Sequence, residues 1–330
     1  MSYFLPIEAI RLPFSLPAWL SERVLRLRRI TGFVTVYGEE ADWRTAFFAR
    51  LWHVQRVVEV AQILVELDRS IDVRAVERLA WAHDLNRWPF AHNSERDRFD
   101  QVADIDAYFG PESGFTPAEL KDLKGINAKD PARISEAARV VLLADIITGL
   151  VEDPLFAVIG LNVHPELIPE QVDDLVGYSL TDDDFYGECR ELAEQFHQAR
   201  AAVAAEFSKR VHTLFRDLIE RFLKAHFQDG LPPDFDGIMA ISRHLRATFM
   251  RKNVFPINND MVCHARLLQE EVMPWYFDHC GGTTERLLEM DEYQFVAAVT
   301  GPGSRFRPEQ FRPDLDIVAR EKPRRPFIES

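Results

Sequence analysis

Apolar residues recur every three or four positions along most of this chain, which is the spacing of one face of an α-helix. Asp42 precedes the longest such stretch and is a suitable N-cap, because its carboxylate can accept a hydrogen bond from a backbone N–H of the first turn. The pattern predicts a helix over 42–69, with its apolar face formed by Phe47, Leu51, Val54, Val57, Val58, Ala61, Leu64 and Val65.

Further helices are predicted from similar periodicity and from local start signals. Asp72 is the next N-cap, and Asp130 followed by Pro131 is typical of a helix start. These further helices are expected at about 72–84, 130–152, 181–227 with at least one break, 233–252, 259–279 and 283–299.

The segments between these helices give little sign of β-structure. Residues 85–130 are rich in Asp, Gly, Pro and Asn and predict loops with short helical pieces, and a hairpin-like alternation occurs at 31–38. We therefore expect an all-α chain with a core over 1–180, a C-terminal helical region over 181–300, and a Pro/Arg-rich tail over 301–330 that forms an extended arm.

Composition narrows the class of protein. A hydrophobic fraction of 47% is too high for a disordered chain, and a net charge of −14 argues against a nucleic-acid-binding protein, which needs a basic surface. No apolar run approaches the ~20 residues that span a bilayer, and the N-terminal apolar residues have no basic leader. Three cysteines without a Cys-x-x-Cys pair favour a reducing compartment. We expect a soluble cytoplasmic protein with neither a membrane nor a nucleic-acid partner.

A set of metal-capable side chains occurs within these predicted helices. Asp145 lies on an apolar helical stripe, where a bare carboxylate would cost several kcal/mol, so it needs a cation or a strong donor. His53 lies on a similar apolar face, and His83 and Asp84 end another helix. A mixed set of histidine and carboxylate ligands suits a divalent transition ion such as Mn, Fe, Co, Ni or Zn, and it suits Mg less well. The alternative is that these are hydrogen-bonded core histidines and a salt-bridged aspartate.

The order of these residues resembles a known family. RLWH at 50–53, WAHDLNRWPFAHNSE at 81–95 and LLADIITGLVED at 142–153 together resemble the HD-domain phosphohydrolases, and within them the deoxyguanosine-triphosphatase-like branch. RVLRLRRITGF at 23–33 is similar to the segment that precedes the first metal histidine in that branch. The resemblance covers roughly residues 20–155 and implies that the core is a helical HD domain.

Several site roles are implied by this resemblance. The metal ligands would be His53, His83, Asp84 and Asp145, around one divalent ion. The residues near the reacting phosphate and sugar would be His92 as the acid for the leaving oxygen, Glu95 as its partner, Arg50 on a phosphate oxygen, and Asp153 on a sugar hydroxyl. The implied reaction converts a deoxynucleoside triphosphate and water into deoxynucleoside and triphosphate. A homo-oligomer is expected from the resemblance alone.

The sequence also departs from the family pattern. Asn86 and Arg87 occupy the positions at which relatives have Gly-His. An arginine can bind phosphate but cannot act as an acid or base near pH 7. Gly149 stands where relatives commonly have a tyrosine, which argues against sugar stacking there. Two alternatives therefore stay open: hydrolysis of another nucleotide (a monophosphate, a cyclic nucleotide or an alarmone), and a non-catalytic nucleotide sensor.

Overall fold

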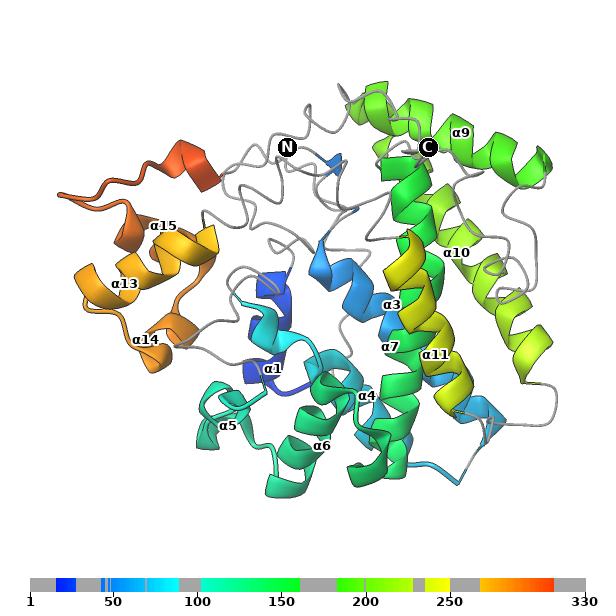
Figure 1. Cartoon of the computed structure of the whole chain (residues 1–330), viewed down its shortest axis with the longest axis horizontal. Helices are drawn as coiled ribbons and strands as arrows, with labels where there is room; N and C mark the ends of the chain where they lie inside the picture. The colour runs from blue at the N-terminus through cyan, green and yellow to red at the C-terminus, as the bar shows by residue number, and fades with distance from the viewer. Residues whose placement is uncertain are drawn as a thin grey trace, which may run out of the picture. The chain divides into compact units, whose positions relative to one another are not determined.

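The computed structural model describes residues 16–27, 43–44, 47, 49–68, 70–88, 102–160, 183–198, 200–227, 235–249 and 268–311. Over these ranges the ordered elements are helices, with no strand, so the predicted all-α class is confirmed (Figure 1). The predicted helix start at Asp42 and the hairpin at 31–38 lie outside the described residues. None of the described helices combines the length and apolar character that a membrane span requires.

The chain forms two compact units that interleave along the sequence. The first comprises Met1–Val65, Ser70–Leu142 and Asp260–Pro313. Its main described helices are α1 (Ala18–Arg26), α3 (Arg50–Leu67), α4 (Val73–Ala82), α5 (Ile105–Tyr108), α6 (Pro117–Ala128), α13 (Met273–His279), α14 (Thr284–Glu289) and α15 (Glu292–Val299).

Packing within the first unit joins segments that are far apart in sequence. Helix α4 contacts both α1 and α6, and α14 contacts α5. The buried indole of Trp88 donates its Nε1–H to the carbonyl of Leu287 at 3.1 Å and meets the ring of Phe295 edge-on. A buried Trp N–H needs such an acceptor, so this contact fixes the residues after α4 against α14 and α15.

The second unit comprises Glu66–Arg69, Leu143–Asn259 and Asp314–Ser330. Its described helices are α9 (Asp183–Gln198), α10 (Ala204–His226) and α11 (Phe235–Leu245), and a π-helical turn, η7 (Phe156–Gly160), packs on α9. Helix α7 (Glu136–Leu155) begins in the first unit and continues into the second. The predicted domain boundary near 180 lies outside the described residues, so that division stays a prediction.

Helix boundaries agree with the sequence where the start signal is local. Asp72 caps α4, accepting from the backbone N–H groups of Arg74 and Ala75. Asp130 does not start α7: it caps a single 3₁₀ turn, after which Ile134 is extended. Helix α7 instead begins after Ser135, whose hydroxyl accepts from the N–H of Ala138.

Two further expectations differ from the structure. The helix predicted over 283–299 is two helices, because Asp291 and Gln294 form a capping box that starts α15. Residues 301–311, expected to begin an extended arm, contain turns and a 3₁₀ helix (Pro308–Phe311). Phe306 and Phe311 are buried there, so this part of the predicted tail packs as core.

Candidate metal centre

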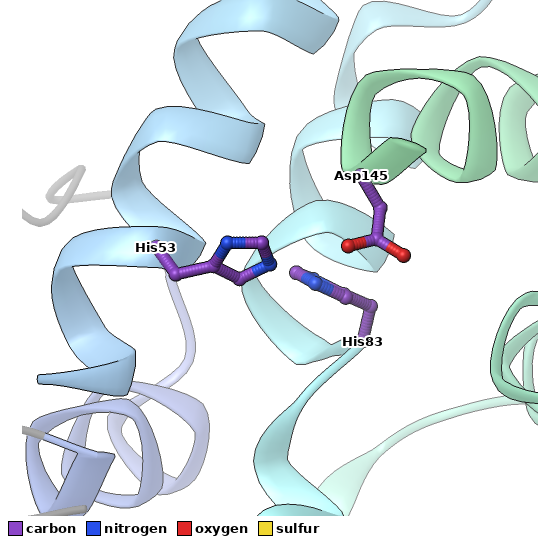
Figure 2. Close-up of side chains that lie close together, drawn as sticks. All are labelled: His53, His83 and Asp145. Carbon is purple, nitrogen blue, oxygen red and sulfur yellow. The ribbon is translucent and has the colours of Figure 1, made fainter. Parts of the chain in front are cut away.

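Three helices bring two imidazoles and one carboxylate to a common point. His53 on α3, His83 at the C-terminal end of α4 and Asp145 on α7 each offer one ligand atom, and these atoms lie within 4.8 Å of one another (Figure 2). Both histidines are buried, and the rings are 5.8 Å apart between centroids. Two histidine nitrogens and a carboxylate oxygen are a donor set that divalent transition metals accept, so the group can hold such an ion.

The ring of His83 is oriented by its own helix. Its Nδ1 lies 2.7 Å from the carbonyl oxygen of Ala80, and because a carbonyl only accepts, Nδ1 carries the proton and donates. The neutral ring then has its lone pair on Nε2, the nitrogen that a metal would bind. A hydrogen bond from the other ring nitrogen is the usual way in which proteins fix a metal-binding histidine.

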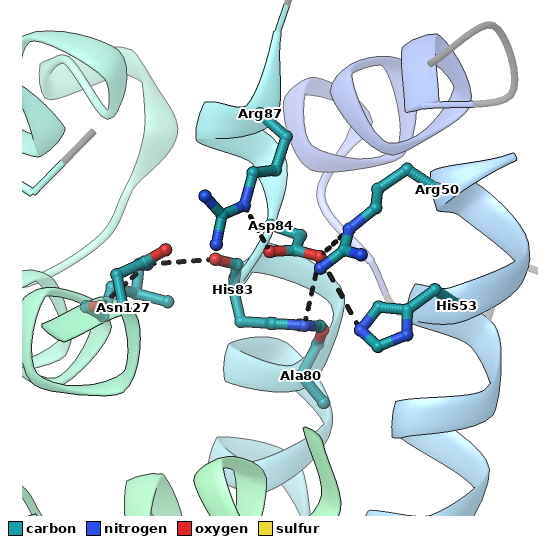
Figure 3. Close-up of polar contacts among 8 residues, drawn as sticks. Arg50, His53, Ala80, His83, Asp84, Arg87 and Asn127 are labelled. Carbon is teal, nitrogen blue, oxygen red and sulfur yellow. Dashed lines mark hydrogen bonds and ion pairs between the residues drawn. The ribbon is translucent and has the colours of Figure 1, made fainter. Parts of the chain in front are cut away.

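The backbone at His83 is held by a second helix. The side chain of Asn127 on α6 donates through Nδ2 to the carbonyl of His83 at 3.0 Å and to that of Leu123 at 2.9 Å (Figure 3). The same helix supplies Asp122, whose two carboxylate oxygens accept from the backbone N–H and the hydroxyl of Ser135, just before α7. Helix α6 therefore contacts the backbone of His83 and the start of α7, the helix that carries Asp145.

Asp84 lies beside the metal-capable group and is bound by two arginines. Its Oδ2 accepts from Nε of Arg50, and its Oδ1 accepts from Nε of Arg87 at 3.1 Å. The arginines approach from opposite sides of the carboxylate (Figure 3). Oδ2 is also 3.8 Å from Nε2 of His53 and 3.5 Å from Nε2 of His83.

The charge of Asp84 is stabilised in spite of its burial. Burial is the largest influence and raises the pKa of the carboxyl, but Arg50, His83, Arg87 and His53 together lower it, and the net pKa is well below its usual range. Asp84 is therefore an ionised carboxylate that holds two guanidinium groups beside the histidines.

The structure brings six of the predicted site residues into two groups. His53, His83 and Asp145 come together as a possible ligand set, which does not include Asp84. Asp84, Arg50 and Arg87 form the adjoining ion cluster. Asp153 lies on α7, eight positions after Asp145. His92 and Glu95 lie outside the described residues.

Sequence reasoning missed Asn127 and the carbonyl of Ala80. Asn127 falls in a stretch expected to be mostly loop, and its contact with His83 spans 44 positions, so no local signal marks it. The Ala80 contact, in contrast, follows from the chain itself, because a histidine ending a helix can bond to a carbonyl one turn earlier.

Comparisons with family models, with curated proteins and with solved structures find no match to this chain. The class that the fold and the site define is thus an all-α protein with a His53–His83–Asp145 group that can hold a metal ion.

Proposed function

We propose that this chain is a metal-dependent nucleotide phosphohydrolase that splits deoxynucleoside triphosphates into deoxynucleoside and triphosphate. The observation that carries the proposal is the possible metal-ligand group of His53, His83 and Asp145 with two arginines alongside, Arg50 and Arg87. The sequence resemblance to the deoxyguanosine-triphosphatase-like branch supports the choice of substrate.

The charges around the group suit an anionic substrate. The site carries two positive and two negative side-chain charges, which sum to zero: the guanidinium groups of Arg50 and Arg87 and the carboxylates of Asp84 and Asp145. A bound divalent cation would therefore give the site a net positive charge. A fixed positive site attracts phosphate and stabilises the negative charge that develops on it during transfer.

The reaction requires few further groups. A divalent ion held by His53, His83 and Asp145 would supply a water of lowered pKa and polarise a phosphoryl oxygen. Cleavage would join a water oxygen to the α-phosphorus and break the bond from that phosphorus to the sugar 5′-oxygen, and the proton that the water loses would balance the one that the 5′-oxygen gains. Arg50 and Arg87 would neutralise the phosphoryl oxygens. The departing 5′-oxygen needs a proton, and His92 is the candidate donor by resemblance.

The test is product analysis on protein loaded with Mn²⁺ or Co²⁺. Each of the four deoxynucleoside triphosphates is incubated with the protein, and deoxynucleoside and tripolyphosphate are separated by anion exchange. We expect tripolyphosphate and deoxynucleoside in equal amounts. Orthophosphate or a nucleoside monophosphate as the first product would indicate a different nucleotide hydrolase activity. If no nucleotide is turned over at all, the proposal that this chain is an enzyme is refuted.

The second candidate is a protein that binds nucleotide without turnover. It is favoured by one observation, namely that both oxygens of Asp84 are engaged by arginines, as expected of a binding cluster. Thermal stabilisation by a nucleotide with no product formed would support this candidate over the hydrolase.

A further inference from the structure

Trp88 connects the ion cluster to the C-terminal part of the first unit. It directly follows Arg87, the arginine that donates to Oδ1 of Asp84, and its side chain is buried. Its Nε1–H donates to the carbonyl of Leu287 across 199 positions of sequence, and its ring meets that of Phe295 edge-on. Trp88 therefore joins a short turn at the site to helices α14 and α15, and all of these residues belong to the first unit.

The end of α14 supplies acceptors for side chains from other parts of the chain. The last carbonyls of a helix have no α-helical partner, so they need donors from elsewhere. The carbonyl of Leu287 accepts from Trp88. The next two carbonyls accept from Arg26 on α1, at 2.5 Å for Leu288 and 3.1 Å for Glu289. These contacts hold α14 against both α1 and the indole of Trp88.

The turn that carries Arg87 is too short to orient this side chain alone. It is a single 3₁₀ turn, η3 (Leu85–Arg87), closed by a backbone hydrogen bond of 3.0 Å from the N–H of Arg87 to the carbonyl of Asp84. Such turns have poorer hydrogen-bond geometry than an α-helix. The turn is fixed on one side by the end of α4 and on the other by Trp88, whose backbone is extended. The direction in which Arg87 reaches Asp84 thus depends on both ends (Figure 3).

We infer that Trp88 is a positioning residue: by binding α14 it holds Arg87 in the orientation that meets Asp84. Helices α14 and α15, although distant in sequence, are then part of what allows the site to bind phosphate. The inference rests on the proposed function only for the phosphate that Arg87 would bind. The contact of Arg87 with Asp84 exists without any ligand, so the positioning can be tested separately.

The first test observes Arg87 directly, in metal-free protein without ligand. Hydrogen exchange at the Nε–H groups of Arg50 and Arg87 is followed by heteronuclear NMR, and Arg50→Gln and Arg87→Gln assign the two signals by removing them. Both groups donate to Asp84, so Arg50 is the internal reference. The test variant is Trp88→Phe, which keeps an apolar ring but lacks the N–H.

Trp81→Phe is the matched control. Trp81 is another buried tryptophan of the first unit, and its Nε1–H has no hydrogen-bond partner among the described residues. The substitution therefore removes the same atoms at both positions, but only at Trp88 does it remove a described hydrogen bond. A difference between the two variants reports the contact of Trp88 with Leu287.

We expect Trp88→Phe to speed exchange at Arg87 by about fivefold or more, the equivalent of about 1 kcal/mol, and to leave exchange at Arg50 unchanged. In Co²⁺-loaded protein, calorimetry should show inorganic tripolyphosphate bound about tenfold more weakly by this variant. The Co²⁺ affinity should not change, because Arg87 is outside the ligand set. In an Arg87→Gln background, Trp88→Phe should weaken tripolyphosphate binding no further. Trp81→Phe should match wild type in each measurement.

Three results would overturn the positioning role. Exchange at Arg87 that is unchanged in Trp88→Phe would show that the indole does not hold this arginine. Exchange that rises equally at Arg50 and Arg87 would show a general loosening instead. A loss of tripolyphosphate binding that persists in full in the Arg87→Gln background would show that Trp88 acts through another group.

A different result would refute the proposed function. If Co²⁺-loaded wild type binds no tripolyphosphate, the proposed function and the phosphate part of the inference both fail. The exchange measurement still decides whether Trp88 positions Arg87, so the two failures are distinguishable.

Discussion

Substitution of Asp84 by asparagine tests the role of the ion cluster. The side chain of Asp84 is 2% exposed and accepts from Nε of both Arg50 and Arg87. Asparagine keeps the shape but removes the negative charge, and its amide nitrogen would face a guanidinium group. Two buried or half-buried cations then lose the carboxylate between them.

The expected cost follows from the burial of this cluster. Removing one partner of a buried ion pair costs about 3–5 kcal/mol, because the remaining charge is left without compensation. Arg50 and Arg87 are 17% and 11% exposed, so water can recover part of that cost. We therefore expect the free energy of unfolding to fall by about 3 kcal/mol.

The assay is urea unfolding in the presence of EDTA, so that no metal contributes to stability. The control is Asp106→Asn, which makes the same chemical change in the ion pair of Asp106 with Lys124. Those side chains are 62% and 35% exposed, and such surface pairs contribute about 0–1 kcal/mol. A loss for Asp84→Asn as small as that for Asp106→Asn would refute the reasoning.

A double-mutant cycle isolates the contact itself. Arg87→Gln removes one of the two guanidinium groups, so Asp84→Asn should cost less in that background than in wild type. The interaction energy is expected at about 1–3 kcal/mol, the range for residues in one network. Strict additivity of the two substitutions would mean that the contact of Asp84 with Arg87 contributes nothing.

Three further predictions concern Asn127, Cys189 and Phe311. Asn127→Ala should lower the free energy of unfolding by about 1–2 kcal/mol and weaken metal binding, because the carbonyl of His83 loses its hydrogen bond from Asn127. An unchanged metal affinity in a calorimetric titration would contradict this prediction. Burial raises the pKa of the Cys189 thiol to about 12, so native protein should leave Cys189 unalkylated by iodoacetamide at pH 8.5, as mass spectrometry can show. The raised pKa also means that stability should fall as pH rises from the unfolded thiol pKa toward 12, and Cys189→Ala should lessen that fall. Phe311→Ala should lower the free energy of unfolding, measured with urea, by about 3–5 kcal/mol, because Phe311 is buried. If Phe311 belonged to an exposed arm, the same substitution would change this free energy very little.

The sequence predicts those parts of the fold whose signals are local. The cap at Asp72 and the helical class depend on residues within one or two turns, and both agree with the structure. The start of α7 lies later than Asp130 because Ser135 supplies the capping hydroxyl, and Ser135 is itself held by Asp122, 13 positions earlier. The capping box of Asp291 and Gln294 is a local signal, but it lies within a continuous apolar pattern that by itself predicts one helix.

In the candidate site too, the sequence predicts the features that have local signals and does not predict those that depend on distant contacts. Apolar faces around His53 and Asp145 predict that both side chains turn inward; the structure brings them together with His83, with both histidines buried and Asp145 partly exposed. The sequence could not show that Asp84 is held between Arg50 and Arg87, because either an ion or an arginine would satisfy a buried carboxylate.

The central claim is that His53, His83 and Asp145 hold one divalent ion, and metal content measures it most directly. Wild type, Asp145→Ala and Asp153→Ala are incubated with Mn²⁺ or Co²⁺, desalted and assayed by inductively coupled plasma mass spectrometry. Asp153→Ala is the matched control, because it removes the same group from the same helix outside the ligand set. We predict a stoichiometric ion in wild type and Asp153→Ala and its loss in Asp145→Ala. Equal metal content in all three proteins, or none in folded wild type, would contradict the account.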